Sequence, residues 1–432
     1  MKLKKLFAKI LLLVVFTTSI LNISYASTAE NLANLNNNIH SKAAVVIEET
    51  TGKVIYNKNA YERNYPASTT KILTAIIAIE ECNLDETAVA SEYAITSIPS
   101  GYTDANIQIG ESLSIKDLLY AMMVKSANEA AVIIAEHISG NVDEFSKLMN
   151  KKAEEIGCKD SHFVNPNGVH DENHYSTAYD MAIIAQYCMK NETFRKIVST
   201  TSYTLPATNM YESNDRTFSN SNTLIIKNNN AREDNYYYPY ATGIKTGYTS
   251  SAQNCLVASA EKNGMKFISV VLGATLTDEG LSERYLDTIN LFEYSFDNYS
   301  FQKVKDKGNF IETVSIDNAS SDTKNLEIAI DDNIIALTSL DVNISELNPE
   351  IILDEDLKAP IEIGDTVGKI KYEIEGITYE ADLVAKSEVK KKTYIGYIIY
   401  GIIAIIIAGV VIVNYNIKRK KRIQRINYKN NF

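Results

Sequence analysis

The sequence predicts an α+β domain followed by a small all-β domain and a C-terminal transmembrane helix. Strand pairs and helical runs alternate over residues 42–298, the first predicted domain. Short Ile and Val runs with Gly and Asp breaks occupy 299–390 and are typical of β-strands. The run 394–413 contains no charged residue and is long enough to cross a bilayer. With 432 residues, the chain is too long for one ordinary core, which agrees with two domains.

Two β-hairpins are expected in the first domain. The β-rich runs 43–47 and 54–56 flank a turn, and so do the runs 255–260 and 266–272. The second turn contains Asn-Gly, a pair that favours the backbone conformation of tight hairpins. These four runs are therefore predicted to be antiparallel strands.

Helices are expected between and after the hairpins. Length, apolar content and a spacing of three to four residues between apolar positions indicate each of them. Their expected ranges are 69–81, 115–125, 129–139 and 280–296.

The N-terminal residues 1–26 have the order of a secretory signal peptide. Lysines come first, an apolar stretch follows from Ile10 to Leu21, and small residues end at Ala26, where cleavage is expected. An uncleaved membrane anchor is the alternative, although the apolar stretch is short for a full span. The polar residues 27–41 are predicted to be a flexible lead-in to the first domain.

The C-terminal end predicts topology. A cluster of Lys and Arg at 418–425 follows the apolar run, and the positive-inside rule then puts the basic tail 414–432 in the cytoplasm. The protein is therefore expected in the cell membrane as a single-pass protein with both predicted domains outside. The net charge is −11 although both ends are basic, and such an acidic ectodomain argues against nucleic-acid binding.

Four cysteines are scattered without CxxC spacing, and the sequence shows no zinc pattern among them. They are Cys82, Cys158, Cys188 and Cys255. Disulfides and free thiols are both possible. If disulfides form, the sequence cannot choose among the three possible pairings. His170 and His174 are four residues apart, but nearby Pro and Gly mark a loop and no third ligand cluster appears. We therefore expect neither a metal nor a cofactor.

Ser68 and Lys71 are the first candidate catalytic pair. Three residues apart at the start of a helix, their side chains lie on one face and can touch. A serine hydroxyl needs a base, and a neutral lysine can serve as one. Lowering the pKa of Lys71 from about 10.4 to near 7 costs roughly 4 kcal/mol. Burial, the positive helix end and a second lysine, Lys245, would act in that direction.

Ser126 and Asn128 lie in the expected break between two helices. From there Ser126 can relay a proton between Lys71 and a leaving amine, and the Asn128 amide can hold a substrate carbonyl. The alternative role for Asn128 is to cap the helix that begins at Glu129.

Lys245-Thr246-Gly247 lies on a predicted strand. Gly247 leaves room for a substrate backbone to pair along the strand, while Lys245 and Thr246 meet a carboxylate. The N–H groups of Tyr248 and Ser68 are candidates for an oxyanion hole. A plain surface strand is the alternative.

Together these three motifs resemble the low-molecular-mass penicillin-binding proteins, specifically the D-alanyl-D-alanine carboxypeptidases. The resemblance covers roughly residues 40–390. It includes Pro66–Lys71, the loop segments Phe163–Gly168 and His174–Ala182, and the strand Gly243–Thr249.

The resemblance implies a transpeptidase-like fold: an antiparallel five-stranded sheet flanked by helices, with a helical subdomain that carries Ser126. Ser68 would attack the penultimate D-Ala carbonyl of a peptidoglycan stem pentapeptide, and water would hydrolyse the acyl-enzyme. Residues implied to bind substrate are Asn128, Lys245, Thr246, Gly247, Tyr248 and Thr249. β-Lactams are implied as covalent inhibitors, and 299–390 as a stalk.

Two other functions are weighed against this one. A β-lactamase shares the three motifs but needs a carboxylate for deacylation, and no Glu-x-x-Leu-Asn type segment occurs between 160 and 185. A catalytically idle wall-binding protein would not need a Ser–Lys pair.

The chain departs from the family pattern in three places. Ser221 stands where some members have a basic residue, so carboxylate binding is expected to depend on Lys245, Thr246 or another cation such as Arg216. Tyr248 replaces a His found in other members. The Tyr-rich insertion 228–240 has no role that the sequence assigns.

Overall fold

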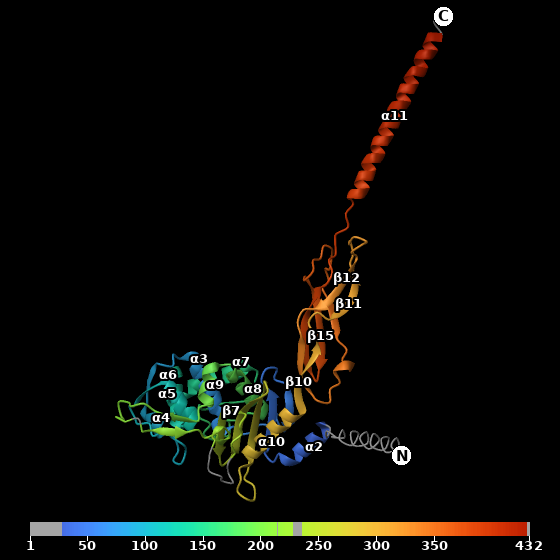
Figure 1. Ribbon diagram of the computed structural model, residues 1–432. Helices are drawn as coiled ribbons and strands as arrows, with labels where there is room; N and C mark the ends of the chain where they lie inside the picture. Colours follow the sequence, from blue (N-terminus) through green and yellow to red (C-terminus); the bar gives the residue numbers. More distant parts are fainter. Residues whose placement is uncertain (1–27, 214, 228–235, 430–432) are drawn as a thin grey trace, which may run out of the picture. The chain divides into compact units, whose positions relative to one another are not determined.

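The computed structural model describes residues 28–213, 215–227 and 236–429 (Figure 1). The expected signal peptide 1–26 lies outside the described residues. The chain divides into two compact units, the first made of Met1–Phe301 with Leu337–Val342, the second of Gln302–Ala336 with Asn343–Phe432.

A five-stranded antiparallel sheet with the order β2-β1-β9-β8-β7 organises the first unit. Its strands are β1 (Ala43–Glu48), β2 (Val54–Lys58), β7 (Ala241–Thr249), β8 (Gln253–Lys262) and β9 (Met265–Ala274). Both predicted hairpins are confirmed as the pairs β1–β2 and β8–β9. Strand β7 is the last strand of the sheet, so one of its edges has no strand beside it in the described chain.

Helices cover both faces of this sheet, as the figure also shows (Figure 1). The elements outside the sheet are η1 (Ala67–Thr70), α3 (Lys71–Glu81), β3 (Thr87–Val89), α4 (Glu92–Thr96), β4 (Ser112–Ser114), α5 (Ile115–Tyr120), η2 (Ala121–Lys125), α6 (Asn128–Ser139), α7 (Val142–Ile156), α8 (Ala178–Met189), α9 (Glu192–Val198), β5 (Ser202–Thr204), β6 (Thr217–Ser219), η3 (Thr223–Ile225) and α10 (Glu283–Asn298). Alternation along β1 explains the two layers. Val45 and Ile47 join the larger core with α3, whereas Ala44 and Val46 join the core beneath α10.

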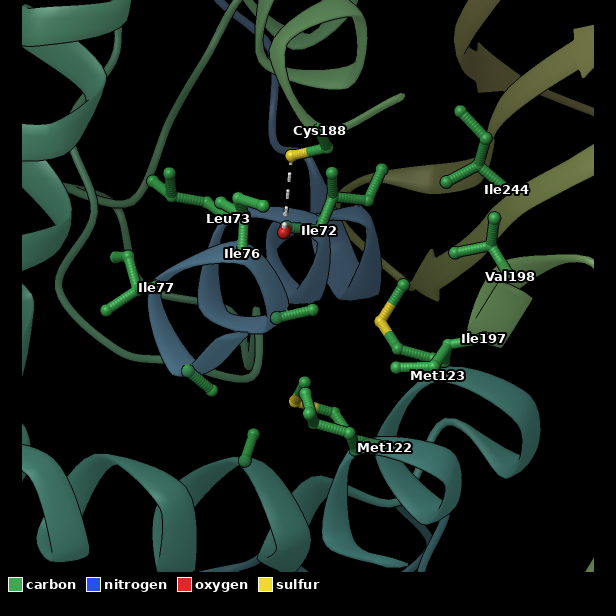
Figure 2. Close-up of a cluster of buried hydrophobic side chains, with 14 of the residues drawn as sticks. Ile72, Leu73, Ile76, Ile77, Met122, Met123, Cys188, Ile197, Val198 and Ile244 are labelled. Atoms are coloured by element: carbon green, nitrogen blue, oxygen red, sulfur yellow. Dashed lines mark hydrogen bonds between the residues drawn. The ribbon is translucent and has the colours of Figure 1, made fainter. Parts of the chain in front are cut away.

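The first eight residues of helix α3, from Lys71 to Ala78, are all buried, which fixes the position of Lys71. Figure 2 shows Ile72, Leu73, Ile76 and Ile77 of α3 among side chains from several other elements. Those neighbours are Met122, Met123, Cys188, Ile197, Val198 and Ile244. Because a buried helix surrounded in this way cannot shift without opening cavities, the residues at its start are held firmly.

The expected flexible lead-in is wrong. Residues Thr28–Asn38 form helix α2, and both Leu35 and the following Ile39 are buried in the core beneath α10. Ile39 directly follows the helix, and its spacing of four residues from Leu35 keeps both side chains on the same side of the segment. The many Asn residues around them made the segment look unstructured in the sequence.

The second unit contains a five-stranded sheet with the order β11-β12-β16-β15-β14. Its elements are β11 (Phe310–Ser315), β12 (Asn325–Ile330), η4 (Ile344–Glu346), β14 (Glu350–Leu353), β15 (Thr366–Ile374), β16 (Ile377–Ala385) and α11 (Ile395–Lys429). Strands β10 (Tyr299–Lys305) and β13 (Ile334–Ser339) pair separately. Helix α11 is the one helix among the described residues that is long and apolar enough to span a membrane. The predicted fold class is thereby confirmed.

Candidate active site

Ser68 and Lys71 meet at the junction of η1 and α3, as their spacing predicts. The Nζ atom of Lys71 lies 2.8 Å from Ser68 Oγ. Ser68 is half-buried and borders a cleft, whereas Lys71 is fully buried behind it. The amine is therefore within proton-transfer distance of the hydroxyl and shielded from water.

The surroundings of Lys71 contain no carboxylate at hydrogen-bond distance among the described residues. Its Nζ donates to the Asn128 side-chain oxygen at 2.8 Å and to the Asn167 carbonyl at 2.6 Å. Burial lowers the pKa of Lys71 well below its usual value, Lys245 lowers it further, and Glu129 opposes the change. Two of the three causes that the sequence indicated, burial and a second lysine, are present. Burial and the second lysine therefore both favour the neutral form of the Lys71 amine.

Ser126 lies at the end of η2, which is wound as one turn of π-helix, in a left-handed conformation with φ 72°. This turn points its hydroxyl toward the third motif: Lys245 Nζ donates to Ser126 Oγ at 2.9 Å. Single π turns inside helices are frequent at functional sites. The break that the sequence predicted between two helices is therefore an ordered π-helical turn that ends in the left-handed Ser126.

Asn128 does not cap helix α6, so the capping alternative is wrong. The residue is the first of the helix; the cap position is Ala127, which makes no side-chain cap bond. Instead the Asn128 amide group bridges two elements: its oxygen accepts from Lys71, and its nitrogen donates to the Thr103 carbonyl at 2.8 Å. The amide thus links the buried lysine to the loop that borders the cleft.

Lys245, Thr246 and Gly247 lie on β7, as predicted. Lys245 is fully buried, and burial together with Arg284 lowers its pKa to about 7. The Thr246 hydroxyl donates to the Ser221 hydroxyl oxygen at 2.7 Å. The structure therefore brings the three motifs into one place, from η1 and α3, from η2 and α6, and from β7.

Two glycines are required where β7 and a loop press against the turn before Ser68. A Cβ atom at Gly247 would lie 3.1 Å from both the Pro66 carbonyl oxygen and Ser68 N. At Gly168, which has φ 79°, a Cβ atom would lie 1.9 Å from the Ala67 carbonyl oxygen. Any side chain at Gly168 would therefore displace the nucleophile turn. The predicted loop 163–168 does border the site.

A cleft of about 400 Å³ joins these residues. All predicted site residues except the buried Lys71 and Lys245 line it, and Tyr248 is the most exposed of them at 59%. Its lining is Ser68, Ser100, Gly101, Tyr102, Thr103, Lys125, Ser126, Asn128, Ser221, Thr246, Gly247, Tyr248, Thr249, Ser250 and Arg284. Among these described residues none is Asp or Glu, and two are cations.

The cation suggested as a substitute for Ser221 is not Arg216. The Arg216 guanidinium donates to the buried carboxylate of Glu111 and is itself nearly buried. Arg284 of α10 lines the cleft instead, with its Nη1 atom 3.3 Å from the Gly247 carbonyl oxygen. Arg284 Nε is buried without a partner among the described residues. Sequence reasoning missed it because it is 37 residues beyond Gly247 and belongs to no motif.

Two further contributors were missed for the same reason. Asn167 offers a backbone carbonyl, which carries no sequence signal. Glu129, buried next to Asn128, accepts from the Ala105 N–H at 2.6 Å, and burial raises its pKa. It fastens the cleft-bordering loop to the start of α6.

His174, one of the two histidines four residues apart, is buried and hydrogen-bonded within the protein. His174 Nδ1 accepts from the Val164 N–H and its Nε2 lies 2.8 Å from Thr70 Oγ1, so both ring nitrogens have partners. Burial lowers the pKa of His174 to about 3. All four cysteines are free thiols in the structure. Of the insertion 228–240, only 236–240 is described, and there Tyr236 stacks on Tyr285 of α10.

Comparisons with known proteins agree with this arrangement. Residues 27–276 match the family described as D-alanyl-D-alanine carboxypeptidase, and 299–391 match "Penicillin-binding protein 5, C-terminal domain". The chain is 34% identical to the carboxypeptidase DacF of Bacillus subtilis over 83% of this chain and 88% of that one. It is 30% identical to DacA of Haemophilus influenzae over 78% and 82%.

Solved structures give the same result. Penicillin-binding protein 5 of Haemophilus influenzae superposes with a TM-score of 0.61 at 27% identity, over 82% of this chain and 98% of that one. The carboxypeptidase DacD of Francisella tularensis gives 0.57 at 27% identity, over 82% and 95%. From its motifs, its cleft and these likenesses together, the chain belongs to the D-alanyl-D-alanine carboxypeptidase family of serine peptidases.

Proposed function

We propose that this protein removes the terminal D-alanine from peptidoglycan stem pentapeptides through an acyl-enzyme on Ser68. The observation that carries the proposal is the 2.8 Å approach of Lys71 Nζ to Ser68 Oγ, in a site where burial and Lys245 lower the pKa of the amine. A neutral amine accepts the hydroxyl proton as Oγ attacks the penultimate D-Ala carbonyl. The C–N bond to the terminal D-Ala then breaks.

The leaving amine needs a proton, and Ser126 supplies it by relay. Its hydroxyl accepts from Lys245 Nζ at 2.9 Å and lines the same cleft as Ser68, so it can pass on the proton that Lys71 took from Ser68. Water then attacks the ester carbon, Ser68 regains its proton, and the tetrapeptide leaves. Over the cycle one water is consumed and one D-alanine is released. The N–H groups of Ser68 and Tyr248 stabilise the oxyanion in both half-reactions.

The terminal carboxylate of the substrate meets Arg284 and the Thr246 hydroxyl. This assignment takes the place of Arg216, whose charge is already matched by Glu111. Support comes from the position of Arg284 on the cleft wall beside the Gly247 carbonyl. Charge-assisted bonds to a carboxylate are about twice as strong as neutral ones, so this contact selects a free C-terminus.

The test is release of D-alanine from a pentapeptide stem by the full chain in detergent. Ser68→Ala and Lys71→Ala should each lose turnover while circular dichroism stays native; Lys147→Ala on exposed α7 and Ser199→Ala are matched controls. In a mass spectrum, penicillin should add its mass to the wild-type peptide that contains Ser68 and should leave the Ser68→Ala variant unlabelled. Turnover by Ser68→Ala at the wild-type rate would refute the proposal, and rapid, repeated hydrolysis of nitrocefin would favour a β-lactamase.

The same proposal includes a membrane topology. Helix α11 would anchor the protein, with the basic segment 418–425 in the cytoplasm and the first unit and the β-strands of the second unit outside. In intact spheroplasts, external protease should remove the catalytic unit and leave an epitope placed after Phe432 protected. Loss of that C-terminal epitope would show that the C-terminus lies outside, which is the opposite of the proposed orientation.

A further inference from the structure

The two helices that carry Lys71 and Asn128 also come together at their opposite ends. Helix α3 begins with Lys71 and ends at Glu81, with Cys82 as its C-cap; helix α6 begins with Asn128 and has His137 in its last turn. At the start of the helices, Lys71 and Asn128 are hydrogen-bonded. At the other end, Cys82 and His137 face Glu86, which lies in the turn after α3.

These three side chains offer metal-ligand atoms in one small volume. Cys82 Sγ, a carboxylate oxygen of Glu86 and a ring nitrogen of His137 all lie within 4.8 Å of one another. His137 Nε2 is 3.1 Å from Glu86 Oε2. A tetrahedral zinc ion with Zn–S of about 2.3 Å and Zn–N of about 2.0 Å separates its ligand atoms by roughly 3.3 to 3.6 Å. Side-chain movements of about 1 Å therefore complete the geometry.

The backbone around the cluster is fixed, which favours a defined site. The Glu86 N–H donates to the Asn83 carbonyl at 3.0 Å, and the Glu86 carbonyl accepts from the Ile115 N–H at 2.9 Å. Cys82 is half-buried with its N–H bonded to the Ala78 carbonyl. Glu86 and His137 reach solvent, so a metal can enter and keep one water ligand.

The surrounding charge favours a cation there. The last carbonyls of a helix carry partial negative charge, and the ends of both α3 and α6 lie at the cluster. A thiolate, an imidazole and a carboxylate together favour zinc. Magnesium and calcium prefer sites made of oxygen ligands. No sequence motif such as CxxC or a closely spaced His pair predicts this site, because its ligands come from the ends of two helices and a turn.

We propose that Cys82, Glu86 and His137 bind one zinc ion, which clamps together the C-terminal ends of α3 and α6. The site is remote from Ser68, since the 11 residues of α3 extend over about 16 Å. Its role is structural: it ties the two helices at one end, as the Lys71–Asn128 contact ties them at the other. It takes no part in the reaction proposed for Ser68.

Cobalt(II) is the probe, because thiolate-bound cobalt absorbs in the near ultraviolet and tetrahedral cobalt in the visible. The full chain in detergent, kept reduced with a phosphine, should take up one Co²⁺ per chain and release it to one equivalent of Zn²⁺. Zinc should raise the thermal midpoint seen by circular dichroism. Cys82→Ser should abolish the near-ultraviolet band and the thermal shift, and His137→Gln and Glu86→Gln should each weaken binding at least tenfold.

Cys158→Ser and His162→Gln are the matched controls and should bind as wild type does. A band that persists in Cys82→Ser, or uptake that is absent from the folded wild type, would overturn the proposal. Circular dichroism of each variant without metal verifies folding. Because metal uptake is read spectroscopically, the result does not depend on D-alanine release, and either proposal can fail without the other.

Discussion

Two buried cationic regions of the first unit differ in what faces the positive charge. Around Lys71 and Lys245 lie serine hydroxyls, an amide oxygen and backbone carbonyls. Around Arg216 lies the fully buried carboxylate of Glu111, which also accepts from the Thr208 hydroxyl at 2.9 Å. Both regions are buried from solvent. Of the two, only the region around Arg216 contains an ion pair, the one with Glu111.

The difference shows how burial is used for two purposes. A guanidinium keeps its charge at any physiological pH, so it needs the carboxylate, and the pair joins segments that are far apart in sequence. Two buried lysines without a carboxylate partner cannot both stay charged, and their pKa values fall. The uncompensated region gains proton-transfer chemistry, whereas the compensated region gains only a fixed structure.

The largest expected effect is on catalysis by Lys71→Met. Removing the base should lower turnover by roughly 10³-fold, the middle of the range for general-base catalysis. Stability should change little, because replacing a desolvated amine by an apolar side chain offsets the loss of the hydrogen bonds to Asn128 and Asn167. D-alanine release and thermal melts followed by circular dichroism measure the two properties; the chain has no Trp for fluorescence. A destabilised but active variant would break the comparison.

The reverse pattern is expected for Glu111→Ala. Breaking a buried ion pair leaves Arg216 uncompensated and should cost about 3–5 kcal/mol of unfolding free energy. Chemical denaturation measures the loss. Glu144→Ala, which breaks an exposed pair with Lys147, is the control and should cost less than about 1 kcal/mol. Equal losses in both variants would mean that burial of the pair does not matter.

Arg284→Ala sharpens the distinction between matched and free cations. If Arg284 binds the substrate carboxylate, its loss should lower kcat/KM by about 10- to 150-fold, the equivalent of roughly 1.5–3 kcal/mol. A peptide that ends in D-alaninamide lacks the charge and should show a much smaller difference between wild type and variant. An equal loss on both peptides would assign Arg284 to structure rather than to recognition.

The smallest effect is the pH dependence of stability. Lys245 has a pKa of about 7 in the folded protein and a normal one near 10.5 when unfolded. Between these values the unfolded chain binds more protons, so stability rises with pH, by at most about 1.4 kcal/mol per unit for this group. Chemical denaturation from pH 7 to 9 measures it. Lys245→Met should reduce the slope, and an unchanged slope would place the titration elsewhere.

Local sequence predicted the parts of the site whose geometry is itself local. Ser68 and Lys71 touch because three residues on a helix lie on one face, and Asn-Gly closes the β8–β9 hairpin because that pair tolerates the turn. Helix α2 was missed although the Leu35–Ile39 spacing is present. Two apolar residues are too few to stand out among polar neighbours, and only the core beneath α10 selects the helix.

The sequence by itself determined the strand pairs, the buried helices, the apolar C-terminal span and the three motifs, because periodicity and short-range sterics are written in neighbouring residues. The tertiary structure alone decided that Arg216 pairs with Glu111, that Arg284 borders the cleft, that the Asn167 carbonyl meets Lys71, and that Cys82 lies beside His137. Those pairings join positions up to about a hundred residues apart. Charge matching and close packing select them only once the chain has folded.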